Sequence, residues 1–269
     1  MSTYSNEHLL YLKKQRKEKR IICFFRVLII ICFLIIWELL SRLELINTFL
    51  SSSPSKVAVT IYELAKDSTL FVHVGVTLYE VLISFIVATI IGFIVALILW
   101  SNKVIAKIID PYLTILNSLP KVALGPLIII WVGASTNSII FMALLISIFV
   151  TIITIYQGFK ETSESYITLL KSFKATKMQI FTKAVLPSNI PSLISALKIN
   201  ISMSLIGVIM GELLVSKSGL GYLIMYGSQV FNINLVITGV VILGVISYIM
   251  YFVIAVSYTH LTLPTKLEV

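Results

Sequence analysis

The chain has 269 residues, of which 58% are hydrophobic and only 12% charged, and its mean hydropathy is +1.01. A soluble domain carries about 25% charged residues, so this composition excludes a soluble domain and predicts an all-α protein that crosses the cytoplasmic membrane several times. The net charge of +9 is typical of the cytoplasmic lysine and arginine excess of membrane proteins, so we expect membrane lipid and no nucleic acid among its partners.

The chain begins with a basic tail, residues 1–20, which precedes an apolar run over residues 21–40. The run is long enough to cross a bilayer and longer than the apolar core of a cleavable signal peptide. We therefore expect it to remain as the first membrane span. The lysines and arginines of the tail predict that the N-terminus lies in the cytoplasm.

A polar stretch, residues 41–75, leads to the second span, which we expect over residues 76–100. Within this stretch, Ser55 is placed to cap a short amphipathic helix that ends at Lys66. Glu80 stands barely a turn inside the second span. A carboxyl group at that depth either reaches the membrane interface or faces the helix bundle, and the sequence favours the interface.

The third span, residues 112–133, is predicted to be interrupted. Proline follows Asp110 and again follows Leu119, and each proline predicts a break in the helix. Proline at membrane depth is tolerated where protein or water satisfies the freed backbone groups. We therefore expect this broken helix to line the interior of the bundle, at Pro120, Gly125 and Pro126.

Three more spans follow, over residues 138–157, 192–214 and 235–256, with an outer loop at 215–234. Most of the 21 lysines and arginines fall in regions that this six-span topology places in the cytoplasm, which predicts that both termini lie there. The fifth span has small side chains on one face, which lets helices approach closely. These are Ser192, Ser195, Ser202, Ser204, Gly207 and Gly211.

The loop between the fourth and fifth spans, residues 158–191, is an organised polar segment. Apolar side chains recur at helical spacing on both sides of Lys174 and Ala175, which predicts two short amphipathic helices with a turn between them. Thr176 and Gln179 have the spacing of a capping box, in which a hydroxyl and an amide cover free N–H groups at a helix start. Such organisation outside the bilayer predicts a docking surface.

The loop resembles the corresponding segment of the membrane permeases of ATP-binding-cassette importers of the type I fold, in particular their nitrate/sulfonate/taurine branch. The family pattern reads E-A-A, three residues, G, nine residues, I, one residue, L-P, and its register begins here at Thr168. Leu186 and Pro187 match it, whereas Lys174 stands at the glycine and leaves the turn geometry open. Neighbouring residues match what the branch carries: Tyr166, Ala175, Gln179, Ile180, Phe181 and Val185.

Two further stretches support the resemblance, which covers about residues 50–256. Residues 119–127 look like the broken third core segment of the branch, and residues 211–224 look like its outer loop after the fifth span. At the start of the second span, where the branch carries an arginine and a glycine, this chain has Glu80 and Ser84.

The resemblance implies a permease domain over residues 21–256 that works as a homodimer and carries no enzymatic activity. It would form the path for a small anionic or heterocyclic solute such as nitrate, a sulfonate, taurine or a thiamine precursor. ATP would bind a separate ATPase subunit, because the chain lacks a G-x-x-x-x-G-K-[ST] motif. An extracytoplasmic solute-binding protein would deliver the solute, and the chain itself would bind no cofactor.

The resemblance also implies roles for particular residues. Residues 158–191, which we call the coupling loop, would contact the ATPase, with Leu169, Leu170, Phe173 and Phe181 as the buried anchors. The full set in the loop is Tyr166, Leu169, Leu170, Phe173, Lys174, Ala175, Gln179, Phe181, Leu186 and Pro187. Glu212, Gly219 and Gly221 are candidates for an outer gate.

A secondary transporter or channel without an ATPase is the alternative. It would need ionisable groups at mid-membrane, whereas Arg26, Glu38, Glu80, Lys198 and Glu212 all lie near span ends. Among these Glu212 is the most interesting, although the sequence favours an interfacial place in the outer loop for it. The three histidines lack metal-ligand spacing, so no metal site is expected.

The last segment, residues 257–269, changes character abruptly. Its run Ser-Tyr-Thr-His-Leu-Thr-Leu-Pro-Thr resembles the translation of sequencing-adapter DNA, in which case the native C-terminus is missing. An ordinary polar tail is the other interpretation.

Overall fold

The structure is a computed structural model that describes residues 6–262. Over these residues it contains helices and no strand, which confirms the all-α fold. The chain divides into two compact units, Met1–Glu63 and Leu64–Val269, and each is described by itself.

The first unit is built on α1 (Asn6–Arg42), followed by α2 (Thr48–Ser51) and the start of the amphipathic helix α3 (Pro54–Lys66). The Glu38 carboxylate, near the end of α1, accepts the N–H of Ser55 at 3.1 Å. The prediction that Ser55 caps α3 is wrong. The helix already begins at Pro54, so Ser53 supplies the capping oxygen and accepts the N–H of Lys56 at 3.3 Å.

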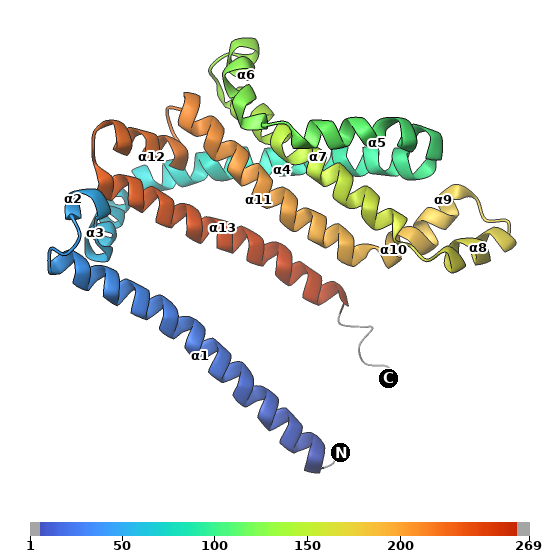
Figure 1. Cartoon of the computed structure of the whole chain (residues 1–269), viewed down its shortest axis with the longest axis horizontal. Helices are drawn as coiled ribbons and strands as arrows, with labels where there is room; N and C mark the ends of the chain where they lie inside the picture. Colours follow the sequence, from blue (N-terminus) through green and yellow to red (C-terminus); the bar gives the residue numbers. More distant parts are fainter. Residues whose placement is uncertain (1–5, 263–269) are drawn as a thin grey trace. The chain divides into compact units, whose positions relative to one another are not determined.

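Three long helices pack side by side at the centre of the second unit: α4 (Thr69–Ser101), α7 (Thr136–Lys160) and α11 (Ile190–Val215). The last long helix, α13 (Ile233–Thr262), packs against α11 and against the short helix α12 (Leu220–Gln229). Two helices of the coupling loop, α8 (Glu164–Ser172) and α9 (Lys177–Ile180), lie at one end of this unit, and α12 lies at the other (Figure 1).

The contact between α7 and α11 depends on glycine. A Cβ atom on Gly207 would collide with the backbone of Ala143, and one on Gly211 would lie 3.0 Å from the Cα atom of Ile139. The small-residue face predicted for the fifth span therefore lets the two helices approach closely, as expected.

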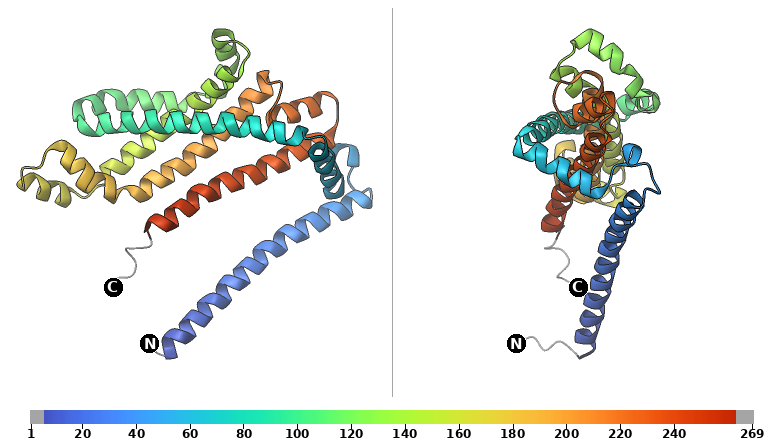
Figure 2. Two further views of the ribbon diagram at one scale, coloured as in Figure 1. Left: turned by 180° about the vertical axis from the view of Figure 1, so that it is seen from behind. Right: turned by 90° about the vertical axis from the view of Figure 1, so that its left-hand side faces the viewer.

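The broken helix consists of α5 (Lys103–Ser118), a 3-10 turn η1 (Lys121–Leu124) and α6 (Gly125–Val132). Figure 2 shows α5 folded back along α4. The break predicted at Pro120 is confirmed: Leu119 is extended, as a residue before proline prefers, and the two parts meet at an 80° bend. The break predicted at Pro111 is wrong, because this proline lies on an exposed side of α5 and the helix continues through it.

Five helices among the described residues are long and apolar enough to cross a membrane, and the bent pair makes a sixth if it counts as one span. This agrees with the six predicted spans. Two boundaries differ. α4 begins at Thr69 because the helix runs through Gly75, and the predicted outer loop contains α12. The backbone of α13 is described to Thr262, and the rest of the predicted tail lies outside the described residues.

Candidate functional site

The coupling loop has the two helices and the turn that the sequence predicts. Lys174 lies in the turn with φ 55°, in the left-handed region that glycine adopts without strain. The glycine of the family pattern therefore coincides with a real conformational demand, and lysine meets it here.

The capping box of α9 is also confirmed. The Thr176 hydroxyl accepts the N–H of Gln179 at 3.3 Å, and the Gln179 side chain accepts the N–H of Thr176 at 2.8 Å. Both hydrogen bonds satisfy backbone groups that would otherwise be free at the start of a short helix.

Phe181 fastens the coupling loop to the spans. It begins a π-helical turn, η2 (Phe181–Val185), that leads through α10 (Leu186–Ser188) to α11. Only 3% of it is exposed, and its ring centroid lies 5.3 Å from that of Trp100 and 5.2 Å from that of Phe159. The prediction that Phe181 anchors the ATPase is therefore wrong, because the side chain belongs to this chain's own core.

The two ends of the loop are tied together by buried polar side chains. The Asn189 amide donates to the hydroxyl of Thr162 at 2.6 Å and to the carbonyl of Val185 at 2.8 Å. Thr162 in turn donates to the carbonyl of Phe159 at 3.1 Å. The start and the end of the coupling loop are therefore held at one place on the spans.

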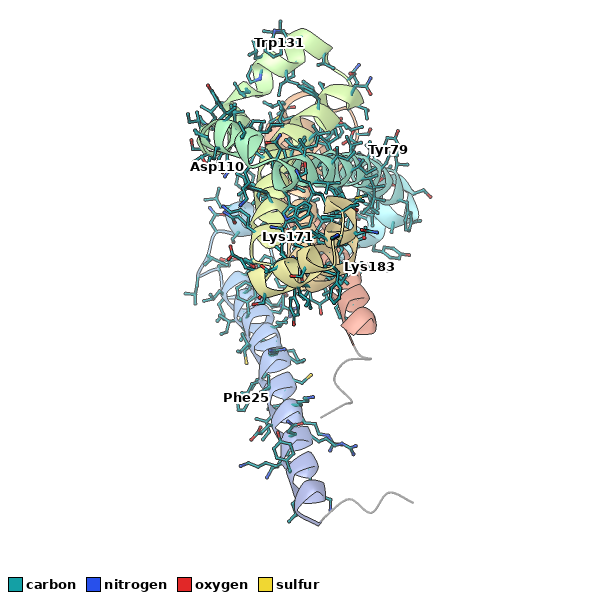
Figure 3. All side chains as sticks on the ribbon, turned by 90° about the vertical axis from the view of Figure 1, so that its right-hand side faces the viewer. Phe25, Tyr79, Asp110, Trp131, Lys171 and Lys183 are labelled. Carbon is teal, nitrogen blue, oxygen red and sulfur yellow. The ribbon has the colours of Figure 1, made fainter. Side chains whose placement is uncertain are left out.

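The outward face of the loop is apolar and exposed. Leu170 is partly buried against the core, so of the predicted anchors Leu169 and Phe173 remain available. Four apolar side chains on the loop are more than half exposed: Tyr166, Leu169, Phe173 and Met178. Lysines stand nearby, including Lys171 and Lys183 (Figure 3).

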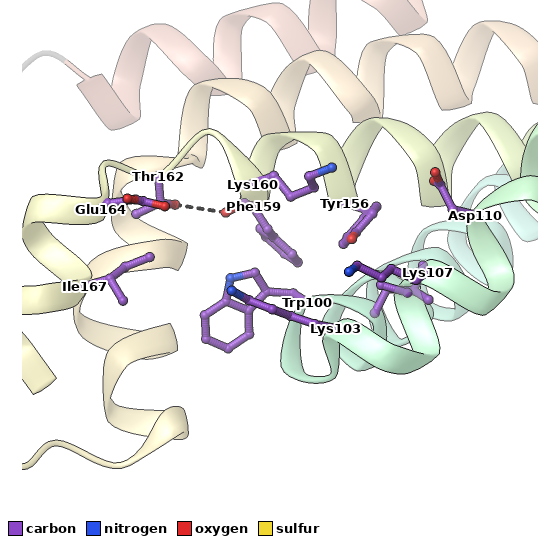
Figure 4. Close-up of a pocket in the computed structure, with 12 residues that line it drawn as sticks. Trp100, Lys103, Lys107, Asp110, Tyr156, Phe159, Lys160, Thr162, Glu164 and Ile167 are labelled. Atoms are coloured by element: carbon purple, nitrogen blue, oxygen red, sulfur yellow. Dashed lines mark hydrogen bonds between the residues drawn. The ribbon is translucent and has the colours of Figure 1, made fainter.

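A basic pocket of about 390 Å³ lies between the coupling loop and the turn from α4 to α5 (Figure 4). Lys103, Lys107 and Lys160 line it together with Trp100. A second pocket of about 580 Å³ adjoins it and reaches Thr168 and Lys171. The inward side of the loop therefore faces cavities rich in lysine, while its outward side is apolar.

A second constellation lies at the other end of the unit, where the turn before α12 meets α4 and α11. The Glu212 carboxylate, 1% exposed, accepts the Thr77 hydroxyl at 2.7 Å and the N–H of Gly221 at 2.5 Å. The Thr77 oxygen accepts the N–H of Leu220 at 2.8 Å. The turn is thereby bonded to both long helices.

Gly219 completes this turn. Its φ is +113°, and a Cβ atom there would collide with the Glu212 carboxylate, so only glycine fits. Its N–H donates to Nδ1 of His73 at 3.0 Å. The structure thus brings together the three predicted gate residues, Glu212, Gly219 and Gly221. It adds Thr77 and His73, which precede Glu80 on α4 and which the sequence analysis missed.

Glu80 and Glu212 are not interfacial, and the favoured prediction for both is wrong. Glu80 is 0% exposed, and neither of its carboxyl oxygens has a hydrogen-bond partner in the described chain. Its side chain interacts with that of Glu212. Glu212 lies near the end of α11, as predicted, whereas Glu80 lies well inside α4, which begins at Thr69. Neighbouring helices enclose Glu80, and the turn at Gly219 covers Glu212.

The remaining observations concern the broken helix, a buried amide on α11 and potential metal ligands. Of the residues on the broken helix, Gly125 is buried beneath Leu214 and Met142, whereas Pro120 and Pro126 are exposed. Asn200, which the sequence analysis missed, donates from α11 to the Phe85 carbonyl at 3.1 Å and to Thr89 at 2.8 Å on α4. An amide in an apolar span was the signal for it. No three potential metal ligands gather among the described residues.

The profile of the family described as "Binding-protein-dependent transport system inner membrane component" matches residues 88–263. A "Probable ABC transporter permease protein" of Haemophilus influenzae is 30% identical over 226 residues, covering 84% of this chain and 91% of that protein. A formylaminopyrimidine transport permease protein of Halalkalibacterium halodurans is 29% identical over 189 residues, covering 70% and 75%.

The fold is similar to that of a chain in the inward-facing MetNI methionine ABC transporter, with a TM-score of 0.64 and 20% identity, covering 71% of this chain and 94% of that one. That likeness extends the sequence match to the arrangement of the helices. The chain therefore belongs to the binding-protein-dependent transport system inner membrane components, and is a multi-pass, non-enzymatic permease subunit of an ATP-binding-cassette importer.

Proposed function

We propose that this permease forms, with a second copy of itself, the path for a small anionic or heterocyclic solute such as nitrate, a sulfonate, taurine or a thiamine precursor. Relatives named for the transport of formylaminopyrimidine, aliphatic sulfonates, taurine and nitrate support this range. A solute-binding protein delivers the solute outside, an ATPase subunit binds inside, membrane lipid surrounds the spans, and both termini lie in the cytoplasm.

The coupling loop is the docking element for the ATPase in this proposal. The observation that carries it is the set of exposed apolar side chains Tyr166, Leu169 and Phe173 at α8 and Met178 on α9, on a loop that also packs into the core. Exposed apolar side chains gathered on one polar loop favour burial against a partner. A face that is rigid before binding loses little conformational entropy when it docks.

The same fixation provides the mechanical link. Movement of the docked loop reaches α4 and α7 through Phe181, and reaches the start of α11 through Asn189. Closure of the ATPase subunits then rocks the permease halves between inward-open and outward-open states. The broken helix, with Pro120, Gly125 and Pro126, lines the path, and the turn bonded to Glu212 gates its outer end.

The test places a charge on the docking face. Leu169→Asp and Phe173→Asp, singly and together, are expected to weaken ATPase binding and to abolish solute uptake while the permease still inserts and dimerises. Desolvation of a new carboxylate in an apolar interface costs several kcal/mol per ion. Co-purified ATPase and uptake into cells are the two measurements.

Thr168→Asp is the matched control, because this substitution adds the same charge on the inward side of α8, where Thr168 lines the second pocket. It is expected to retain ATPase binding. Normal uptake by the Leu169→Asp, Phe173→Asp double variant would refute the docking role of this face.

A further inference from the structure

Glu80 is a buried carboxyl group without a donor. Its residue is 0% exposed, and both oxygens lack a hydrogen-bond partner in the described chain. An ionised carboxylate in an apolar bundle is stable only when donors or a cation compensate it, and otherwise it takes up a proton. Glu80 therefore needs a ligand that the other side chains do not supply.

Its neighbour Glu212, by contrast, has hydrogen-bond donors. Glu212 accepts hydrogen bonds from the Thr77 hydroxyl and from the backbone N–H of Gly221, the pattern that stabilises the ionised form of a carboxyl group. Thr77 has its own oxygen occupied by the N–H of Leu220, so its hydroxyl proton is committed to Glu212. Of the two carboxyl groups, Glu212 is therefore the one whose surroundings suit a negative charge.

The groups around the pair leave no cation to balance a second charge. The side chains that act on Glu80 are Glu212 on α11 and the neutral hydroxyl of Thr136 on α7. His73 on α4 accepts the Gly219 N–H at Nδ1, as a neutral imidazole does, and its ring stacks on that of Tyr222 from α12. No lysine or arginine of the described residues forms a salt bridge with either glutamate.

We propose that Glu80 and Glu212 form a buried proton-binding site, in which Glu80 holds the proton and donates a hydrogen bond through it to the Glu212 carboxylate. One proton gives Glu80 a partner and leaves a single negative charge, which Glu212 is built to hold. Two interacting carboxyl groups that share one proton are a known solution to this electrostatic problem. The Gly219–Gly221 turn covers the site, so the proton exchanges with the outer solution when the turn moves.

The test uses the full-length permease with its ATPase in lipid nanodiscs. Infrared spectra are expected to show the carbonyl band of a protonated carboxyl group at neutral and mildly alkaline pH. The band is expected to shift on isotope labelling of glutamate and to disappear in Glu80→Gln. Glutamine keeps the shape and still donates to Glu212. Absence of the band from the native protein would overturn the proposal whether or not the variant folds.

Thermal unfolding supplies a second readout. A proton bound in the folded state stabilises it, and this stabilisation is lost as rising pH removes the proton. The native complex is expected to lose thermal stability toward alkaline pH, and Glu80→Gln is expected to lose less. Glu63→Gln, which makes the same chemical change at an exposed glutamate of α3, is expected to behave as the native protein does. Equal pH dependence in the native protein and Glu80→Gln would count against the site.

Deuterium exchange of the carboxyl proton, followed through the infrared band, tests whether the Gly219–Gly221 turn covers the site. This part rests on the proposed transport cycle, whereas the band itself does not. Exchange is expected to be slow in the resting complex and faster after ATP traps the outward-open state. A band that exchanges equally fast in both states would overturn the role of the turn as a cover, while ATP-driven uptake would still stand.

Discussion

At the residue scale, Lys174 shows that a backbone conformation can persist where the residue that usually adopts it, glycine, has been replaced. It holds φ 55° between α8 and the Thr176 cap, where glycine would be unstrained. A left-handed conformation costs an ordinary residue roughly 1–2 kcal/mol. The turn persists because the helix before it, the capping box after it and the buried Phe181 fix both of its sides.

Lys174→Gly is expected to preserve or raise thermal stability, by up to about 1 kcal/mol, because relief of strain outweighs the extra chain entropy of glycine. Lys171→Gly is the matched control. It makes the same chemical change within α8 and is expected to cost about 1 kcal/mol. Unfolding of the detergent-solubilised protein measures both. Equal losses in the two variants would contradict the strain at position 174.

The residue scale also separates what the sequence could reveal from what it could not. The Thr176–Gln179 box was predictable, because its partners lie three positions apart and share one helix start. The burial of Glu80 was not, because its surroundings come from α7 and α11, which are distant in the sequence. Position near a helix end fixes the depth of a side chain and leaves open what covers it.

At the scale of the element, the coupling loop has two faces with different tasks. Its periodicity predicted the helices correctly but assigned Phe181 to the docking face with Leu169 and Phe173. Phe181 lies beyond the turn at Lys174, on a second helical segment whose direction differs from that of α8. Hydrophobic spacing within each segment does not reveal which face of the second segment packs against the spans. Phe181 points into the aromatic cluster with Phe93, Trp100 and Phe159.

Truncation of a phenylalanine to alanine is expected to have different effects on the two faces of the loop. Phe181→Ala is expected to destabilise the permease by about 3–5 kcal/mol, because it leaves a cavity in a packed core. Phe173→Ala, at a side chain that is 76% exposed, is expected to keep the stability of the isolated permease and to weaken ATPase binding. Thermal unfolding and co-purification distinguish the two. Stability loss in Phe173→Ala alone would reverse the assignment of the faces.

The broken helix shows the same division between local and distant causes. The bend at Pro120 was predictable, since a proline restricts the residue before it to an extended conformation. Pro111 carries the same local signal, yet α5 continues through it, packed on α4 and α7. Packing against neighbouring helices decided the outcome at that position, and it lies outside what a single sequence displays.

At the scale of the whole molecule, family membership implies an assembly larger than one chain. Purification of the tagged permease in mild detergent from its native host is expected to recover an ATPase with Walker motifs at one copy per permease, together with a permease dimer. Mass spectrometry identifies the ATPase and native mass measurement gives the stoichiometry. A permease that is recovered without any ATPase would contradict the proposed one-to-one assembly.

One helix, α11, connects the coupling loop with the turn at Gly219. α11 runs unbroken from Ile190 to Val215, about 39 Å at the rise of an α-helix, with Asn189 at its start and Glu212 near its end. The glycines facing Ala143 and Ile139 press it against α7 along this length. A continuous helix transmits displacement along its axis, because it contains no break at which it could bend. Displacement of the coupling loop is therefore expected to be transmitted along α11 to the Gly219 turn.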